Sequence, residues 1–342
     1  MGRLKFPWRG HFWAFALTGL LCLLTGAAVA QQVTLRSSTS LVLVPTLVEG
    51  QNGAPVYNLS AEDFLVKDNG VEQTVHLDTD SETDKTPISI VVLLQVGGSA
   101  VREFHKYLGL PTMVQALAGD NQHRTAVVEF DSRPRILQNF TGDSDAVQQA
   151  IYSIQPGDSG AAILDSLWYA VDMLNDEPKQ NQRVILLLSE TRDHGSRTPV
   201  REVVRKVGES NVIVYSLAFS PGRGDLFDFT HVGSDANLLG PLKMAVQALR
   251  KNTAAGVPKM TGGQYLRFNS GKQLDSEIGM LANQVHNRYI LSFRPSDSTP
   301  GLHLLRVSLR HPLPVRVLAR TSYWAARPSA VIEGDIIPEN SH

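Results

Sequence analysis

Runs of apolar residues and amphipathic segments alternate through the middle of the chain. Four segments are almost continuously apolar, as expected of strands that are covered on both faces: residues 87–96, 124–130, 183–190 and 211–219. Between them, apolar residues recur at helical spacing on two predicted faces: Val101, Phe104 and Leu108, and Ile163, Leu167, Val171 and Leu174. Strands that alternate with helices predict a doubly wound, mostly parallel α/β sheet with helices on both of its faces.

The ends of the chain have a different pattern, in which apolar and polar residues alternate over short stretches. Asn52-Gly53 and Asn69-Gly70 are strong hairpin signals in the N-terminal part. We expect residues 31–80 to form an N-terminal β segment that packs with a C-terminal β segment, residues 288–326, as a small β-sandwich. The α/β domain, residues 86–287, is then inserted in this sandwich.

Single residues predict finer features of the fold. Pro111 is expected to kink or end the first helix of the α/β domain. Residues 135–140 follow a short turn, which favours an antiparallel edge strand. The remaining elements are predicted from composition and periodicity: a surface loop at 220–240, a helix at about 242–254, a strand at 262–268, a helix at about 272–286 and a disordered tail at 327–342.

Residues 1–30 have the pattern of a secretory signal peptide. A basic start precedes an apolar run, and the small residues Ala28-Val29-Ala30 form a cleavage site before Gln31. The alternative is an uncleaved membrane anchor, but the run is shorter than the roughly 20 residues that a spanning helix needs. We therefore expect a secreted or periplasmic protein with no membrane span after cleavage. Cys22, the only cysteine, lies in this segment, so the cleaved chain has no thiol chemistry.

Charge excludes one class of partner. The formal net charge is -1, and charged residues are spread along the chain. Without a basic field, binding to nucleic acid is not expected. In a doubly wound sheet, ligands bind at the loops that leave the carboxyl ends of the strands, which here are residues 95–99, 157–162 and 189–196.

Four segments resemble the von Willebrand factor type A domain in order and spacing: VVLLQVGGSA, VVEFDSRPRILQNFTGD, GAAILDSLWYAVDML and VILLLSETRDHGS. Flanking segments such as MTGGQYLRF and NRYILSFRPSD extend the similarity over about residues 33–325. Together they resemble the secreted von Willebrand factor A-related family first recognised in acidobacterial genomes. This resemblance implies the inserted α/β fold and a module that binds proteins.

The resemblance also implies a cation site at the carboxyl ends of the strands, built in the family from Asp-x-Ser-x-Ser, a Thr and an Asp. In this chain Gln95 replaces the first Asp, Gly97 replaces the first Ser and Ala161 replaces the Thr. Glu190 stands in place of the last Asp, and Ser99 alone matches. Mg²⁺ requires a near-octahedral shell of oxygen ligands, usually with a carboxylate. We therefore expect a degenerate site with no resident cofactor.

Two interpretations of the degenerate site remain open. In the first, Gln95 and Glu190 bond to each other or to the loop backbone where the metal would lie. In the second, Ser99 and Glu190, with Asp193 nearby, hold Mg²⁺ or Mn²⁺ weakly.

The leading hypothesis is a secreted, non-enzymatic binding or scaffold protein whose partner is an unknown protein. The predicted partner surface comprises Gly97, Gly98, Ser99, Asp158, Ser159, Thr191, Arg192 and His194, because loops on a rigid sheet commonly form recognition surfaces. One alternative is an Mg²⁺-dependent adhesion module. A remote alternative is a hydrolase that uses Ser159, since Gly157-Asp158-Ser159-Gly160 is similar to a protease nucleophile turn.

Three weaker signals have simpler interpretations. We expect Asp158 or Ser159 to cap the following helix rather than to act in catalysis, and we expect His194 to be a solvated loop residue without a partner. Arg223-Gly224-Asp225 spells an integrin-recognition tripeptide and is interpreted as a coincidence. Trp168, Tyr169 and Met173 are expected to pack in the core.

Overall fold

The computed structural model describes residues 41–78, 86–119, 122–219 and 240–326. All of them belong to one of the two compact units into which the chain divides, residues 39–327. The predictions for the signal peptide, for the Arg-Gly-Asp tripeptide and for the C-terminal tail lie outside the described residues. No helix in the described ranges is both long and apolar enough to cross a membrane.

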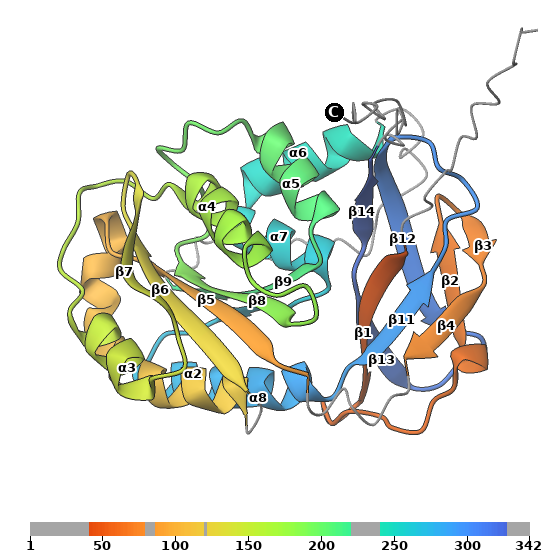
Figure 1. The fold of residues 1–342 in the computed structure, drawn as a ribbon, viewed down its shortest axis with the longest axis horizontal. Coiled ribbons are helices and arrows are strands. Elements are labelled where there is room, and N and C mark those ends of the chain that lie inside the picture. The colour runs from red at the N-terminus through yellow and green to blue at the C-terminus, as the bar shows by residue number, and fades with distance from the viewer. Residues whose placement is uncertain (1–40, 79–85, 120–121, 220–239, 327–342) are drawn as a thin grey trace, which may run out of the picture. The chain divides into compact units, whose positions relative to one another are not determined.

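A six-stranded sheet forms the centre of the α/β part (Figure 1). Its strand order is β10-β9-β8-β5-β6-β7, and every neighbouring pair is parallel except β6 and β7. The antiparallel edge strand was predicted and is confirmed as β7. The bounds are β5 Ile88–Gln95, β6 His123–Phe130, β7 Pro134–Thr141, β8 Gln182–Ser189, β9 Val212–Ala218 and β10 Tyr265–Arg267.

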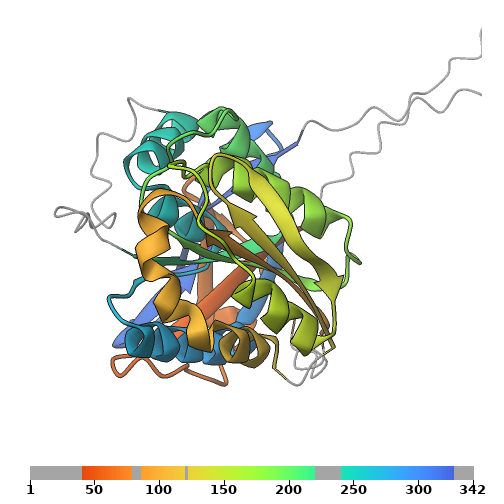
Figure 2. The ribbon, with the colours of Figure 1, turned by 90° about the vertical axis from the view of Figure 1, so that its left-hand side faces the viewer.

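Helices cover both faces of this sheet, as predicted (Figures 1 and 2). One face packs against η3 Gly98–Gly109, α2 Leu110–Ala118, α3 Ser144–Tyr152 and α8 Gly271–His286. The other packs against α4 Ile163–Asn175, α5 Val200–Glu209, α6 Pro241–Lys251 and α7 Thr253–Thr261. Trp168, Tyr169 and Met173 are partly buried in this second layer, which agrees with their predicted core role.

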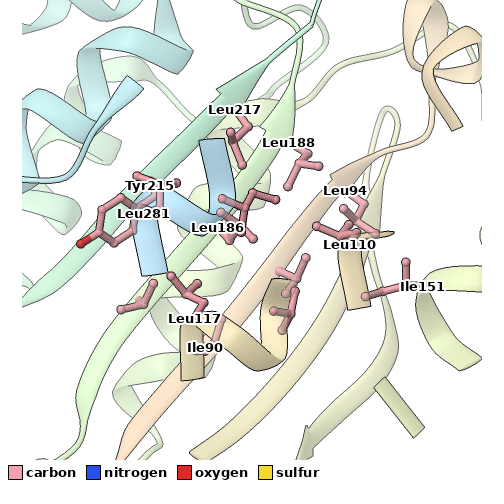
Figure 3. Packing of buried hydrophobic residues seen from close by; sticks show 14 of the residues in the cluster. Ile90, Leu94, Leu110, Leu117, Ile151, Leu186, Leu188, Tyr215, Leu217 and Leu281 are labelled. Atoms are coloured by element: carbon pink, nitrogen blue, oxygen red, sulfur yellow. The ribbon is translucent and has the colours of Figure 1, made fainter. Parts of the chain in front are cut away.

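Alternate residues of each strand supply the two cores. Figure 3 shows Ile90 and Leu94 of β5 beside Leu186 and Leu188 of β8, with Leu117 and Leu281 from the helices of the first layer. These side chains are fully buried. Burial of a side chain of this size stabilises the fold by about 1.5–3 kcal/mol, so the two apolar layers hold the sheet rigidly.

The predicted apolar face of Val101, Phe104 and Leu108 is wrong at Val101 and Leu108, whereas Phe104 packs against the core. Residues 98–109 form a 3-10 helix, and its buried face begins one residue earlier than the predicted face. Ala100, Glu103 and Tyr107 are the buried residues, whereas Val101 is 37% and Leu108 is 71% exposed.

Of two predicted helix boundaries, the one at Pro111 is confirmed and the other is corrected. The first helix ends at Gly109, and Pro111 stands in the first turn of the next helix, α2, where its missing N–H costs nothing. The single helix expected at 242–254 is two helices, α6 and α7, separated at Asn252. The Asn252 side chain accepts a hydrogen bond from Ala255 N at 2.9 Å and thereby caps α7.

Segments from both ends of the chain pair in two antiparallel sheets, as predicted for the sandwich. The sheet orders are β13-β1-β11-β4 and β14-β12-β2-β3, so each sheet mixes N-terminal and C-terminal strands. Asn69 and Gly70 have φ of 47° and 88° in the tight turn between β2 and β3, which confirms that hairpin. The bounds are β1 Val42–Gly50, η1 Ala61–Asp63, β2 Phe64–Asp68, β3 Val71–Gln73, β4 Val75–Asp78, β11 Tyr289–Phe293, β12 Gly301–Leu309, β13 Val315–Ala319 and β14 Ser322–Ala325.

Candidate recognition site at the carboxyl ends of the parallel strands

Three loops, called here the top loops, meet where the parallel strands end: residues 95–99, 157–162 and 189–196. The chain passes from β6 on one side of β5 to β8 on the other, so the loops after β5 and β8 leave the sheet at its switch point. Backbone bonds join the loops: Gly98 N donates to Asp158 O at 2.8 Å, and Ala161 pairs with His194 in a short bridge. The predicted meeting of these loops is confirmed.

Gln95 joins two of the top loops through both ends of its amide. Its side chain is fully buried. Oε1 accepts a hydrogen bond from Glu190 N at 2.9 Å, and Nε2 donates to Gly97 O at 3.1 Å. This agrees with the interpretation that Gln95 bonds to the loop backbone. An aspartate here could not donate the second bond, because an ionised carboxylate only accepts.

Gly97 leaves no room for the serine that the family pattern places there. A Cβ atom on Gly97 would lie 2.3 Å from Gly160 O and 2.7 Å from Asp158 O. Gly160 is packed as tightly, since its Cβ would lie 2.2 Å from Ser132 Oγ. The backbone of residues 158–160 therefore occupies the space of a side chain at Gly97, Ser132 occupies that of a side chain at Gly160, and the loops interlock.

Ser99, Glu190 and His194 form a polar cluster at the outer side of this interlock. Ser99 Oγ donates to Glu190 Oε2 at 2.9 Å, and His194 Nδ1 lies 2.9 Å from Glu190 Oε1. His194 Nε2 lies 3.0 Å from the carbonyl oxygen of Ser159. The expectation that His194 has no partner is therefore wrong. The carbonyl of Ser159 and the carboxylate of Glu190 can both only accept hydrogen bonds.

Asp158 supports its own loop and does not cap α4, so that prediction is wrong. Its Oδ1 accepts from Gly160 N at 2.7 Å and from Ser132 N at 3.1 Å. The bond from Gly160, followed by bonds from Ser132, holds the pKa of Asp158 below its ordinary value.

Asp193 is the residue that caps α4. Its Oδ1 accepts from Leu164 N in the first turn at 2.9 Å and from Ser196 Oγ at 2.5 Å. The residue before the helix, Ala162, has no side chain that could do this. Asp193 is therefore committed to the helix, and it does not join Ser99 and Glu190 as a third oxygen donor.

Sequence analysis missed the ion-pair group below the loops. Asp131, which directly follows β6, is buried and bonds to Arg135 Nη1 through both carboxylate oxygens, at 3.0 and 3.2 Å. Arg135 Nε also donates to Glu129 Oε1 at 3.1 Å. The signal was available as alternating acids and bases in Glu129-Phe-Asp131-Ser-Arg-Pro-Arg135, which a tight hairpin brings together.

Burial divides the predicted partner surface. Gly98, Asp158, Ser159, Arg192 and His194 are exposed, and Ser99 is half-buried. Gly97 and Thr191 are buried, so they cannot contact a partner directly, and this part of the prediction is corrected. Their role is internal, because Gly97 lets the loops interlock and Thr191 O accepts a bond from Ala254 N at 3.2 Å.

The residues present do not fit a divalent cation. Gln95 uses both ends of its amide, Gly97 and Ala161 have no side-chain oxygen, and both oxygens of Glu190 face Ser99 or His194. In the described ranges, no three His, Cys, Asp or Glu side chains come close enough to share a metal ion. A near-octahedral oxygen shell cannot be built from this set without rearrangement.

Comparison with known families decides the kind of domain. Residues 93–192 match the family model described as von Willebrand factor type A domain. The matched range runs from the end of β5 into the loop after β8, so it contains Gln95, Gly97, Ser99 and Glu190 but ends before Asp193 and His194. Residues 93–192 therefore belong to a von Willebrand factor type A domain. This domain is inserted in the sandwich. Comparison with curated proteins gives no match.

Solved structures with similarity to the type A region come from varied sources. BatB from Bacteroides thetaiotaomicron is 13% identical, with 58% of this chain and 98% of that chain covered and a TM-score of 0.41. Proximal thread matrix protein 1 from the mussel byssus, with a zinc-occupied metal-ion-dependent adhesion motif, is 14% identical, with 65% and 50% covered and a TM-score of 0.42. The PilB minor pilin from Streptococcus sanguinis is 12% identical, with 58% and 61% covered and a TM-score of 0.42. Similarity this low carries no information about what this chain binds.

Proposed function

We propose that the type A domain binds a protein partner through the exposed part of its top loops, without a bound cation and without catalysing a reaction. The contact residues in this proposal are Gly98, Ser99, Asp158, Ser159, Arg192 and His194. The observation that carries it is the interlock at Gly97, which holds exposed polar groups on a rigid sheet while it fills the space of the cation ligands. Type A domains are typical adhesion and protein-interaction modules, which supports the choice of a protein as partner.

Rigid loops favour recognition because little conformational entropy is lost when a partner binds them. The backbone bonds between the loops already fix Gly98 and Asp158 relative to each other. The exposed groups differ in charge, with Asp158 an acid and Arg192 a base. A partner with polar and oppositely charged groups at matching positions fits this surface better than an apolar one.

Cation-independent binding is supported by the commitment of Gln95 and Glu190 to other partners. Adding Mg²⁺ or Mn²⁺ is expected to leave the melting temperature of the purified chain equal to that in EDTA, because an ion that does not bind the native state cannot stabilise it. A reproducible rise of several degrees with either ion would favour the Mg²⁺-dependent adhesion module instead.

The arrangement around Ser159 supports the absence of hydrolase activity. A catalytic histidine must reach the serine Oγ with an unprotonated nitrogen. Here His194 Nε2 faces the backbone carbonyl of Ser159, where it can act only as a donor. We expect no turnover of ester or peptide substrates by the purified chain. Turnover that the Ser159→Ala variant abolishes would contradict this part of the proposal.

Partner capture tests the proposed surface. The purified chain is immobilised, exposed to extracellular and periplasmic fractions, with and without EDTA, and the bound proteins are identified by mass spectrometry. A partner retained equally in both conditions is then titrated against Arg192→Glu. Affinity is expected to fall about tenfold or more for this variant, as for an interface residue whose charge is reversed.

The matched control is Arg205→Glu, which makes the same change on the exposed surface of α5, where Arg205 pairs with Glu202. Its affinity is expected to remain within about twofold of wild type, because the changed charge lies outside the top loops. Equal losses in both variants would place the interface elsewhere. The expected source of the partner follows from the proposed secreted or periplasmic location, which rests on the pattern of residues 1–30.

A further inference from the structure

A cavity of about 600 Å³ lies at the opposite end of the parallel sheet from the top loops. Its lining includes Arg183 and Val212, which stand at the amino ends of β8 and β9, and Leu43 of β1 in the sandwich. We call it the basal pocket. A volume of this size is in the usual range for small-molecule sites.

The charged residues of the described lining of the basal pocket are basic. Lys179, Arg183, Arg288 and Arg320 line it together with His286, and no Asp or Glu is among the lining residues that the structure describes. The neighbouring acid, Glu177, faces other groups, since it accepts from Ser89 Oγ at 2.9 Å and pairs with Arg124 at 3.5 Å. Within the described part of the chain, the four permanent cations therefore meet in one cavity without a counter-charge from its lining.

Arg288 has a hydrogen-bonding edge without an acidic partner. Its Nη1 donates to Gly262 O, and its buried Nε and Nη2 have only the neutral Tyr215 hydroxyl as a polar neighbour on the side chains of the described residues. Its guanidinium carbon lies 5.4 Å from the ring centre of Tyr215, whose hydroxyl points away from Leu186 in the apolar cluster (Figure 3). Nε–H and the adjacent Nη2–H form the two-donor edge that binds carboxylates and phosphates in a bidentate manner.

Arg183 and Arg320 are also short of acidic partners. Arg183 donates to Glu177 O at 3.1 Å and to Asn175 Oδ1 at 3.4 Å, and its buried Nε has no partner among the described residues. Arg320 is buried and donates to Ser322 O at 2.7 Å, a neutral acceptor. Burial lowers the pKa of Arg320 to about 10, with only a small opposing effect from Tyr323.

We propose that the basal pocket binds a small organic anion in which a carboxylate or phosphate is joined to an apolar body. Buried cations without counter-charge are costly, and an anion offsets that cost while it satisfies the donors of Arg288 and Arg183 that lack an acidic partner. The apolar body fits the rest of the lining, where Leu43, Val212 and Ile290 contribute hydrocarbon surface. This site lies outside the type A top loops and does not depend on the proposed protein partner.

Naphthalene probes test the head group and the body separately. Binding of 2-naphthoate, 1-naphthyl phosphate, inorganic phosphate and the neutral 2-naphthamide to the purified chain is measured by fluorescence titration and by calorimetry. The two naphthyl anions are expected to bind with one site per chain. The neutral amide and the bare phosphate are each expected to bind at least about tenfold more weakly, because each lacks one of the two recognised parts.

Two variants place the site, and one controls for surface charge. Arg288→Met and Arg183→Met are each expected to weaken 2-naphthoate at least about tenfold through the loss of charge-assisted bonds. Arg205→Met, which removes an exposed arginine from α5, is expected to leave the affinity within about twofold because Arg205 is not among the residues that line the cavity. Circular dichroism and thermal unfolding show which variants are folded, and either pocket variant suffices if the other does not fold.

Several results would overturn the proposal. Equal binding of the naphthoate and the amide would mean that the cations do not recognise the head group. Unchanged affinity in a folded Arg288→Met or Arg183→Met variant would place the anion elsewhere. Binding only after Asp80, Glu82 and Asp84 are changed to their amides would mean that acids of this chain, and not a free ligand, balance the pocket.

Discussion

At the carboxyl ends of the parallel strands, polar groups of the top loops bond to one another. At the amino ends, the cations of the basal pocket have no carboxylate beside them among the lining residues that the structure describes. The top loops carry a recognisable family pattern, and the basal pocket carries none. The family motif therefore indicates where related domains place their site. Charged or hydrogen-bonding groups that lack a partner indicate which site in this chain can still bind a ligand.

The largest expected effect comes from opening the interlock at Gly97. Gly97→Ser restores the family residue but forces its Cβ against two backbone carbonyls, so we expect a loss of about 3 kcal/mol in the free energy of unfolding. Urea denaturation measures it. Gly279→Ser is the matched control, because a Cβ there meets nothing within 4 Å. Similar stability in the two variants would show that the loops are not interlocked.

The next effect concerns the buried amide that replaces the family aspartate. Gln95→Asp removes the donor to Gly97 O and places a carboxylate in a fully buried position, so we expect a loss of about 2 kcal/mol. A millimolar excess of Mg²⁺ is expected to leave the melting temperature of this variant unchanged, since Gly97 and Ala161 still supply no ligand. Recovery of the wild-type melting temperature with Mg²⁺ would show that the cation site is intact apart from one residue.

Two arginines test the contrast in charge directly. Arg135→Met leaves the carboxylates of Asp131 and Glu129 without their partner, and we expect a loss of about 1–2 kcal/mol after allowance for the exposure of Arg135. Arg183→Met removes a cation that has no acidic partner, so we expect a smaller loss. Chemical denaturation at neutral pH compares them. A larger loss for Arg183→Met would mean that the basal pocket is internally balanced.

The smallest effect is expected at acid pH and involves Asp158. Hydrogen bonds from Gly160 and Ser132 lower its pKa from the ordinary value of 3.8, so the ionised form is favoured in the folded state. The resulting stability is present above that ordinary value and is lost as the pH falls through the lower, folded-state pKa. Thermal unfolding between neutral and strongly acidic pH is expected to decline less for Asp158→Asn than for wild type. Identical pH profiles for the two proteins would show that the ionised Asp158 side chain does not stabilise the loop.

Much of the fold was predictable because its signals are local. The four apolar runs became β5, β6, β8 and β9, and Asn69-Gly70 became the turn of a hairpin. The errors fell where packing overrides periodicity. The buried face of residues 98–109 begins at Ala100, one residue earlier than the spacing of Val101 and Phe104 predicts, and the adjacent bond from Gly98 N to Asp158 O joins segments that a local pattern does not relate.

The candidate site was predictable in position and less so in its contacts. The roles of Ser99, Glu190 and Gln95 followed from the family pattern, but the partners of His194 and the cap that Asp193 supplies to α4 did not. The contact of His194 with Ser159 spans 35 positions and that of Asp193 with Leu164 spans 29. The basal pocket was missed because its arginines come from separate segments and form no motif.

The order of residues alone determined the class of fold and the loss of the cation ligands, because strand and helix periodicity and the identity of a side chain are local properties. Only the tertiary structure showed that the backbone of another loop fills the space beside Gly97, and that Arg183, Arg288 and Arg320 line one cavity. Packing density and electrostatic balance depend on distances between segments that are remote in the chain, and those distances exist only once the chain has folded.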